Sequence, residues 1–228
     1  MEDTAYITAN PHAETVLENQ NMDKRKYTAA ARRFYRYGSW NQVGTGDLGL
    51  YDPVFSYTSG INLENEDKID DVTPPRHITD RTISAMRKND FDRVICHYMQ
   101  PHYPWISGAI QEEREVQEYE RNPVKVKKFG KKKVFNAYLD DLRYVLDDIR
   151  LLLNNVDAGE VAISADHGDA FGEYGIFGHD PGRFHPQVRF VPWVTTTAVD
   201  KNEYEPKITP QSRRQTSVDD QLEDLGYH

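Results

Sequence analysis

Residues 161–180 read VAISADHGDAFGEYGIFGHD and carry most of the functional information in this chain. The apolar run at 161–163 is partly β-branched and gives way at once to the sequence SADHG at 164–168. This pattern predicts a buried strand that runs directly into a loop. Asp166 and His167 would then lie at the carboxyl end of the strand, where open α/β sheets bind their ligands.

The residue types in this loop suit the binding of a cation and an anion. Asp166 and His167 offer an oxygen and a nitrogen donor to a divalent metal, and His179 follows twelve positions after His167. Glycines leave the backbone between the two histidines free to approach an anion closely; they are Gly168, Gly172, Gly175 and Gly178. The alternative is an ordinary surface loop that happens to contain two histidines.

The block resembles the C-terminal metal-site signature of the sulfatase family, in the alkaline-phosphatase superfamily. That signature is a strand, then Asp-His-Gly, then Gly-Glu-x-Gly, then Lys or His, matched here by 166–168, 172–175 and His179. The family continues into a second strand with a Val-Pro pair, which RFVPWV at 189–194 resembles. Upstream, HYMQPHYPW at 97–105 is similar to the family's Pro-His-x-Pro element, whose histidine contacts the sulfate group.

The resemblance covers about residues 5–197 and implies an α/β fold. We expect an alkaline-phosphatase-like α/β/α sandwich with a mostly parallel sheet, incomplete at its N-terminus. A sulfatase-like catalytic domain would occupy residues 1–200. A polar, mostly disordered tail would follow at 201–228, with a possible short helix at 218–225.

The family's nucleophile segment has no counterpart in this sequence. Family members carry an acidic metal-binding pair and then a nucleophile in a Cys/Ser-x-Pro-x-Arg context, and this pattern occurs nowhere here. The single cysteine, Cys96, lies in the apolar run 94–96, where a cysteine usually behaves as a small hydrophobe. We therefore expect a truncated domain that needs an N-terminal complementing segment and is weakly active or inactive alone.

The resemblance also implies a role for each candidate residue. Asp166 and His167 would be metal ligands, while His102 and His179 would be catalytic and contact the ester oxygens, one of them as the general acid. Arg183 would help to bind the anionic substrate. Calcium is the family's usual ion, and manganese, magnesium or zinc also suit these donors.

Three functions remain open on these residues. The first is a sulfatase-like hydrolase of sulfate esters, possibly on a glycan. The second is a metal-dependent phosphotransferase or phosphodiesterase of the same superfamily, because the loop does not distinguish a phosphate from a sulfate ester. The third is a non-catalytic remnant that binds a metal or a glycan.

Composition narrows the choice of partners. The formal net charge of −9 disfavours general binding to nucleic acid. The sequence has neither a signal-peptide pattern nor a run near the roughly 20 apolar residues that a membrane span requires. We therefore expect a cytoplasmic chain without a membrane span. A single cysteine excludes an internal disulfide.

Periodicity and turn signals predict the other elements. The expected strands are 5–9, 91–99 and 161–165, and the expected helices are 24–36, 80–88 (capped by Thr79 and Asp80) and 134–153. Residues 38–75 look irregular, and the basic run 125–133 looks like a solvated loop, with polyanion binding as its alternative.

The helix at 134–153 is expected to be a crossover between two parallel strands, 91–99 and 161–165. That topology would bring His102 to the same sheet edge as Asp166. The helix carries four aspartates expected on its solvent face: Asp140, Asp141, Asp147 and Asp148.

Overall fold

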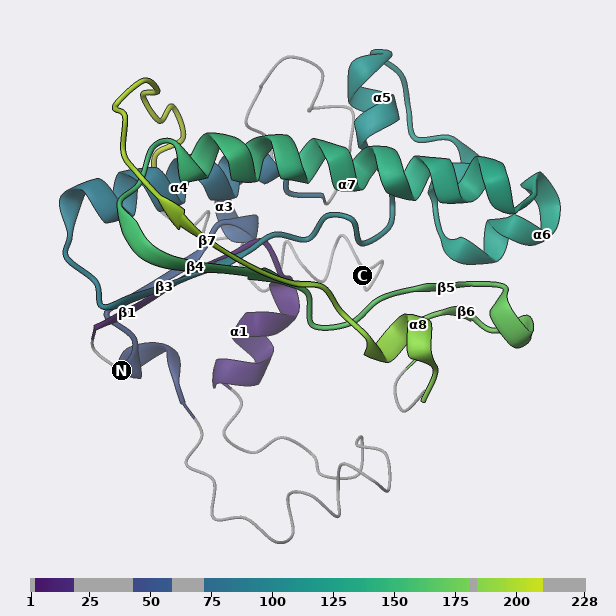
Figure 1. Ribbon diagram of the computed structural model, residues 1–228, viewed down its shortest axis with the longest axis horizontal. Coiled ribbons are helices and arrows are strands. Elements are labelled where there is room, and N and C mark those ends of the chain that lie inside the picture. The colour runs from purple at the N-terminus through teal and green to yellow at the C-terminus, as the bar shows by residue number, and fades with distance from the viewer. Residues whose placement is uncertain (1–2, 19–42, 59–71, 181–183, 211–228) are drawn as a thin grey trace, which may run out of the picture.

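The computed structural model describes residues 3–18, 43–58, 72–180 and 184–210 (Figure 1). It is an α/β structure, as predicted, in which helices pack over a parallel sheet. Three sequence-based expectations fall outside the described residues: the helix at 24–36, the short helix at 218–225, and Arg183.

The core of the fold is a sheet of three parallel strands in the order β2-β1-β3. These are β1 (Thr4–Thr8), β2 (Leu50–Pro53) and β3 (Arg93–His97). The central strand contributes Ala5 and Ile7, both fully buried. The strands predicted at 5–9 and 91–99 are therefore confirmed, the first shifted by one residue and the second shorter at both ends.

The segment 38–75 is not irregular throughout, so that prediction is wrong for part of it. It supplies β2 and the short helix α3 (Phe55–Thr58). Asp52 at the edge of β2 is buried and accepts hydrogen bonds from Tyr57 Oη at 2.6 Å and Arg81 Nε at 2.8 Å. Asp52, one of the polar residues that suggested a loop, is thus a hydrogen-bonded partner inside the core.

Helix α4 (Pro75–Lys88) packs against β1 and β3 and begins well before the predicted start at residue 80. Its N-cap is Pro74, with no side-chain capping bond, so the predicted cap at Thr79 and Asp80 is wrong. Both residues lie inside the helix and are buried. A Pro-Pro pair can start a helix in this way, because the first N–H groups need no intrahelical partner.

Residues 201–210 pack against α4 rather than forming a disordered tail, as had been expected from Lys201 onward. The carboxylate of Asp80 accepts hydrogen bonds from Tyr204 Oη at 2.8 Å, Lys207 N at 2.7 Å and Ile208 N at 3.0 Å. Ile208 is buried in the core cluster that also contains Ile7. The division between a domain at 1–200 and a tail at 201–228 stays a prediction.

Helix α7 (Lys131–Leu153) is the longest helix and confirms the one predicted at 134–153. Asp140 and Asp147 are exposed as expected, but Asp141 and Asp148 are buried, which corrects the assignment of all four to the solvent face. Helical periodicity explains this, since positions 141, 145, 148 and 152 share one face. Asp141 Oδ1 accepts bonds from the backbone N–H groups of Ile106 and Ser107, and Asp148 pairs with Arg76.

The strand before the Asp-His-Gly loop is β4 (Ala158–Ser164), and it pairs antiparallel with β7 (Trp193–Ala198). Within the described residues β4 and β3 belong to different sheets, so the predicted βαβ crossover within one parallel sheet is wrong. The second strand with its Val-Pro pair is confirmed as β7, but it begins at Trp193 rather than at residue 189. Arg189 ends the short helix α8 (Pro186–Arg189), and the Val-Pro pair directly precedes the strand.

The remaining elements are short, and several of them pack against α7. They are α1 (Pro11–Glu18), η2 (Thr45–Asp47), α5 (Ser107–Gln111), η4 (Glu118–Glu120), η5 (Pro123–Lys125), α6 (Val126–Phe129), β5 (Ala170–Phe171), η6 (Glu173–Gly175) and β6 (Phe177–Gly178). β5 and β6 form an antiparallel pair. The basic run 125–133 is largely helical, not the solvated loop that was expected, because it forms α6 and begins α7.

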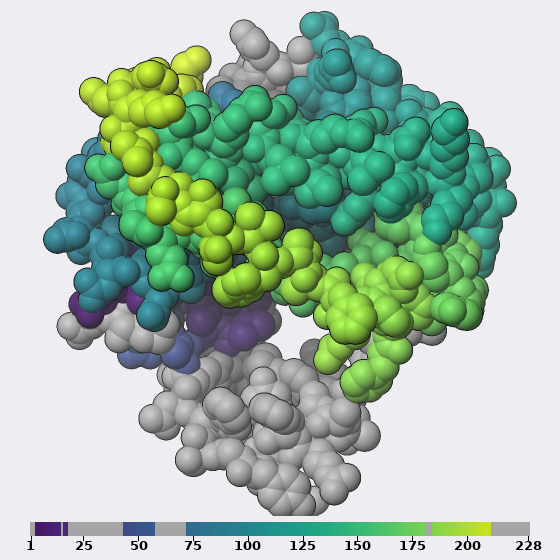
Figure 2. All heavy atoms as spheres, viewed as in Figure 1, coloured from purple at the N-terminus to yellow at the C-terminus, as the bar shows by residue number. Residues whose placement is uncertain are grey.

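Figure 1 shows α4 and α7 on one side of the strands and α1 leading away from the end of β1. In Figure 2 the last described residues, 184–210, run as a yellow-green band across the visible face. No helix in the described ranges combines the length and the apolar character needed to cross a membrane.

Candidate functional site

Three histidines from separate loops meet beside the ends of β3 and β4. His102 follows β3, His167 follows β4, and His179 follows β6. The ring of His179 stacks on that of His167, with centroids 4.0 Å apart, and meets the edge of His102 at 5.2 Å. We call these three residues the histidine cluster. The sequence placed all three in motifs, and the fold brings them into contact.

A buried carboxylate orients His179. Its Nδ1 lies 2.6 Å from Asp169 Oδ1, and the Asp169 side chain is only 6% exposed. The hydrogen bond that His179 donates to this carboxylate raises the pKa of the histidine. The negative charges of Asp166 and Asp180 raise it by smaller amounts. Asp169 was not among the predicted site residues, although its position two residues after His167 could have suggested it.

His102 is held in the opposite electrostatic state. Burial lowers the pKa of His102, and the neighbouring rings of His179 and His167 lower it further. Its Nδ1 lies 2.6 Å from the carbonyl oxygen of Tyr103, so this nitrogen carries the proton in the neutral ring. The cluster therefore pairs a histidine that favours the charged form with one that favours the neutral form, which is the arrangement that separates an acid from a base.

An aromatic layer fixes the loop that carries His102. Trp105 is buried, and its Nε1 donates to the carbonyl oxygen of Pro101 at 3.0 Å. Its ring stacks on Phe171 at 5.9 Å and meets the edge of Tyr138 at 6.3 Å. This layer joins the loop after β3, which carries His102, to α7 and to β5.

Asp166 and His167 present an oxygen and a nitrogen side by side. Asp166 Oδ2 lies 3.7 Å from His167 Nε2, and the Asp166 side chain is 75% exposed. The other ring nitrogen of His167 lies 3.2 Å from the carbonyl oxygen of Gly168, which leaves Nε2 able to act as a ligand.

Two donors are fewer than a protein site for zinc or calcium normally supplies. Among the described residues, no group of three or more His, Cys, Asp or Glu side chains is arranged to hold a metal. The described residues alone therefore do not fit a closed metal site, and no chemical step is derived through a metal.

Gly168 permits a close approach between the Asp-His-Gly loop and α8. Its backbone N donates to Val188 O at 3.0 Å, and a Cβ added here would lie 2.2 Å from Gln187 O. Any side chain at this position would collide with backbone. The glycine of the motif thus has a packing role that follows directly from the geometry.

His97 lies apart from the cluster contacts and has the surroundings of a strand histidine. Its Nδ1 lies 2.7 Å from Tyr6 Oη, and burial lowers its pKa. Cys96 beside it is enclosed, and burial raises the pKa of its thiol to about 11, as expected for an unreactive cysteine.

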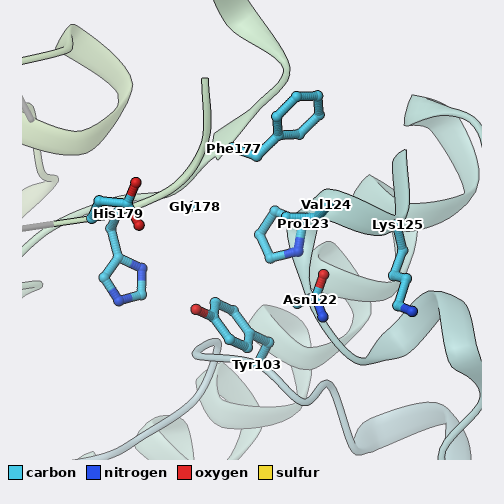
Figure 3. Close-up of a pocket in the computed structure, with 9 residues that line it drawn as sticks. Tyr103, Asn122, Pro123, Val124, Lys125, Phe177, Gly178 and His179 are labelled. Carbon is cyan, nitrogen blue, oxygen red and sulfur yellow. The ribbon is translucent and has the colours of Figure 1, made fainter. Parts of the chain in front are cut away.

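A pocket of about 550 Å³ adjoins the histidine cluster (Figure 3). His179 belongs both to the wall of the pocket and to the histidine cluster. The ring centroids of Tyr103 and His179 are 5.8 Å apart. The residues that line it are Tyr103, Asn122, Pro123, Val124, Lys125, Phe177, Gly178, His179 and Asp180. The sequence did not reveal this pocket, because segments more than 50 positions apart form its walls.

Comparison with known proteins gives little beyond the fold. No family model and no curated protein matches the sequence. Among solved structures, the fold is similar to the soluble domain of lipooligosaccharide phosphoethanolamine transferase A from Neisseria meningitidis, with a TM-score of 0.49 and 19% identity. The match covers 79% of this chain and 60% of that one, so this chain spans less than two thirds of that structure. At this level the likeness does not bear on activity.

Proposed function

We propose that the histidine cluster binds the terminal oxygens of a phosphate or sulfate ester and supports cleavage or transfer of that group. The contact of His102, His167 and His179 is the observation that carries the proposal. The three imidazoles suit an anionic group, and the adjoining pocket of about 550 Å³ leaves room for the rest of the substrate.

The chemistry of the reaction fits the two histidine environments. Ester cleavage needs donors that stabilise developing negative charge and an acid that protonates the departing oxygen. Asp169 accepts a hydrogen bond from Nδ1 of His179, so the Nε2–H of His179 is the donor that can serve as the acid. His102, which carries its proton on Nδ1, can accept a hydrogen bond at Nε2 from the substrate or from a water molecule.

Phosphate and sulfate esters both present a tetrahedral group with anionic oxygens. The proposal therefore covers transfer or hydrolysis of a phosphate ester as well as hydrolysis of a sulfate ester. It does not carry over calcium from the sulfatase resemblance. Metal binding by Asp166 and His167 stays a prediction, which a metal-dependent rise in Tm that Asp166→Ala abolishes would support.

Binding of simple anions tests the proposal. Calorimetric titration with inorganic sulfate and inorganic phosphate should show saturable binding to the intact chain. His179→Gln should weaken it by roughly tenfold, the loss expected when one hydrogen bond to a charged group is removed, whereas His102→Gln should change it less, because the neutral ring presents an acceptor at Nε2. His12→Gln, on the exposed surface of α1, is the matched control and should leave the affinity unchanged. Equal affinities in all four proteins would overturn the proposal.

A further inference from the structure

We infer that an extended, apolar segment of a second polypeptide binds between β3 and β4 as an additional strand and joins their two sheets into one. The two strands belong to separate sheets, yet they share a core beneath the same helices. Each of them also keeps one edge without a strand partner. This binding is independent of the proposed function, because it involves the edges of the strands and not the histidine cluster.

One edge of β3 pairs with β1, and one edge of β4 pairs with β7. Arg93 N donates to Asp3 O, so the backbone of Arg93 faces β1. Because successive residues of a strand face opposite edges, the N–H and C=O groups of Val94 and Cys96 point to the other edge of β3. In the part of the chain that the structure describes, no backbone hydrogen bond reaches this edge or the second edge of β4. We call these the open edges, and such edges are templates for pairing with another chain.

The same face of both strands packs under the same two helices. Cys96 of β3 and Val161 of β4 both contact one core cluster. The buried residues of that cluster include Ile83 of α4 and Leu152 of α7. Figure 1 shows these two helices together on one side of the strands. An added strand would therefore continue a surface that the two existing sheets already share.

The direction and the separation of the two strands suit one intervening strand. Figure 1 shows β3 and β4 running the same way. Burial lowers the pKa of His97 at the end of β3, and the charge of Asp166 just after β4 partly offsets this, so the carboxyl ends lie near each other. Most Cα atoms of β3 are nevertheless more than 8 Å from those of β4. Paired strands are about 4.8 Å apart, so strands on either side of a third are roughly 10 Å apart.

The surroundings define the side chains that the added strand would carry. On the helix side its neighbours are Cys96 and Val161, which pack in the apolar core. On the other side its neighbours are Ile95, which is 43% exposed, and Ala162, which is also exposed. A strand that is flanked on both edges inside a sheet is usually apolar on both faces. The segment is therefore a run of aliphatic, mainly β-branched residues, about as long as the 5 residues of β3.

A different polypeptide fits this place better than a second copy of the chain. A second copy offers the same open edges, and each of them is attached to its own sheet and helices, so it cannot enter between β3 and β4. The net charge of −9 also makes two copies repel each other. Basic residues on either side of the apolar run would instead be attracted to this acidic chain. Binding would fix the position of β3 relative to β4, and with it the loops that carry His102 and His167.

The test adds the peptide acetyl-Lys-Lys-Val-Ile-Val-Ile-Val-Lys-Lys-amide to the intact chain and follows amide hydrogen exchange by NMR. Saturating peptide should slow exchange at Val94 and Cys96 in β3 and, at the same concentrations, at alternate residues of β4. The control peptide carries N-methyl groups on both isoleucines, which keeps its side chains and charge but blocks pairing along one edge. It should bind at least about tenfold more weakly, since two backbone hydrogen bonds are lost.

Two variants locate the bound peptide. Ile95→Lys places a charge next to the added strand and should weaken peptide binding by about tenfold, because the apolar contact is lost and an ammonium must be partly buried. Leu146→Lys on α7 is the matched control, since Leu146 is 44% exposed and Ile95 is 43% exposed, and it should leave the affinity unchanged. Should Ile95→Lys fail to fold, Ile95→Ala should still weaken binding by about threefold.

Three results would overturn the inference. The first is protection of only one of the two strands, or of neither, at saturating or millimolar peptide. The second is equal binding of the N-methylated peptide. The third is slow exchange at Val94 and Cys96 in the chain without peptide, which would mean that this chain or a second copy of it already covers the open edge of β3.

Discussion

Asp169 Oδ1 and His179 Nδ1 lie 2.6 Å apart, and the aspartate side chain is buried beneath the imidazole. This pair raises the pKa of His179 and so favours its charged form. A carboxylate at hydrogen-bond distance stabilises the imidazolium and fixes the orientation of the ring. His179 can therefore donate a hydrogen bond to an ester oxygen in a defined direction. His102 has no hydrogen bond to a carboxylate, and burial lowers its pKa, so it favours the neutral form.

Replacing this carboxylate should lower the pKa of His179. In Asp169→Asn the amide keeps a hydrogen bond to the ring but loses the negative charge, so we expect the pKa of His179 to decrease. An NMR titration of the imidazole signals measures it directly. Asp147→Asn, on the exposed face of α7, is the control and should not move the value. An unchanged pKa in Asp169→Asn would show that the pair does not set the protonation of His179.

A methyl group at Gly168 should destabilise the loop, because its Cβ would lie 2.2 Å from the backbone oxygen of Gln187. We expect Gly168→Ala to reduce the free energy of unfolding by about 1–3 kcal/mol, as is usual for overpacking. Gly159→Ala is a matched control on the same strand-loop unit, since nothing lies within 4 Å of the added Cβ. Urea denaturation of both variants checks the prediction, and equal stabilities would contradict it.

Trp105 should be the most important residue of the aromatic layer beneath His102. It is 1% exposed, whereas Trp193 on β7 is 72% exposed. Trp105→Ala should lower the free energy of unfolding by about 3–5 kcal/mol. Trp193→Ala should change it by less than about 0.5 kcal/mol. Chemical denaturation followed by far-UV circular dichroism measures both, and similar losses would mean that Trp105 is not a core residue.

Asp141 should make stability depend on pH. Burial raises its pKa to about 7, against about 3.9 for an unfolded aspartate. Between these values the folded chain holds a proton that the unfolded chain has released, so stability falls as pH rises from about 4 to about 7. Asp141→Asn keeps an acceptor for the N–H groups of Ile106 and Ser107 but cannot ionise.

The difference between the two proteins isolates this effect. His77, whose pKa burial lowers to about 4, contributes an opposite slope that both proteins share. Relative to the unmodified chain, Asp141→Asn should gain roughly 3 kcal/mol between pH 4 and pH 7 and stay level above pH 8. Urea denaturation at several pH values measures this. Parallel curves would place the pKa of Asp141 near its ordinary value.

The sequence predicted the elements whose signals are local and strong. The helical spacing of apolar residues led to α7, and the apolar runs led to β1 and β3. Charge misled the prediction for Asp141 and Asp148, because ionisable residues on a helix are mostly exposed. Their burial depends on partners that are far away in the sequence: the backbone after Trp105 for Asp141, and Arg76 for Asp148.

The residues of the candidate site likewise divide into those that the sequence predicted and those that it did not. His102, His167 and His179 follow from the motifs that carry them, although β3, β4 and β6 belong to three different sheets. Asp169 and the pocket residue Asn122 were missed. Asp169 lies two residues after His167, but only the fold shows that its carboxylate bonds to His179, and only the fold brings Asn122 to the pocket. The pairing of β4 with β7 was also missed, because pairing depends on which strand is nearest in space rather than on the strand's own residues.

Localising bound sulfate by NMR tests the central claim most directly. Sulfate keeps a constant charge near neutral pH, so shifts in the histidine side-chain signals report binding rather than a change in the ligand. We predict that the Nε2 signals of His102 and His179 shift together and saturably, while that of His12 on α1 stays constant. Equal, non-saturating shifts at all three histidines would contradict an ester-binding site at the histidine cluster.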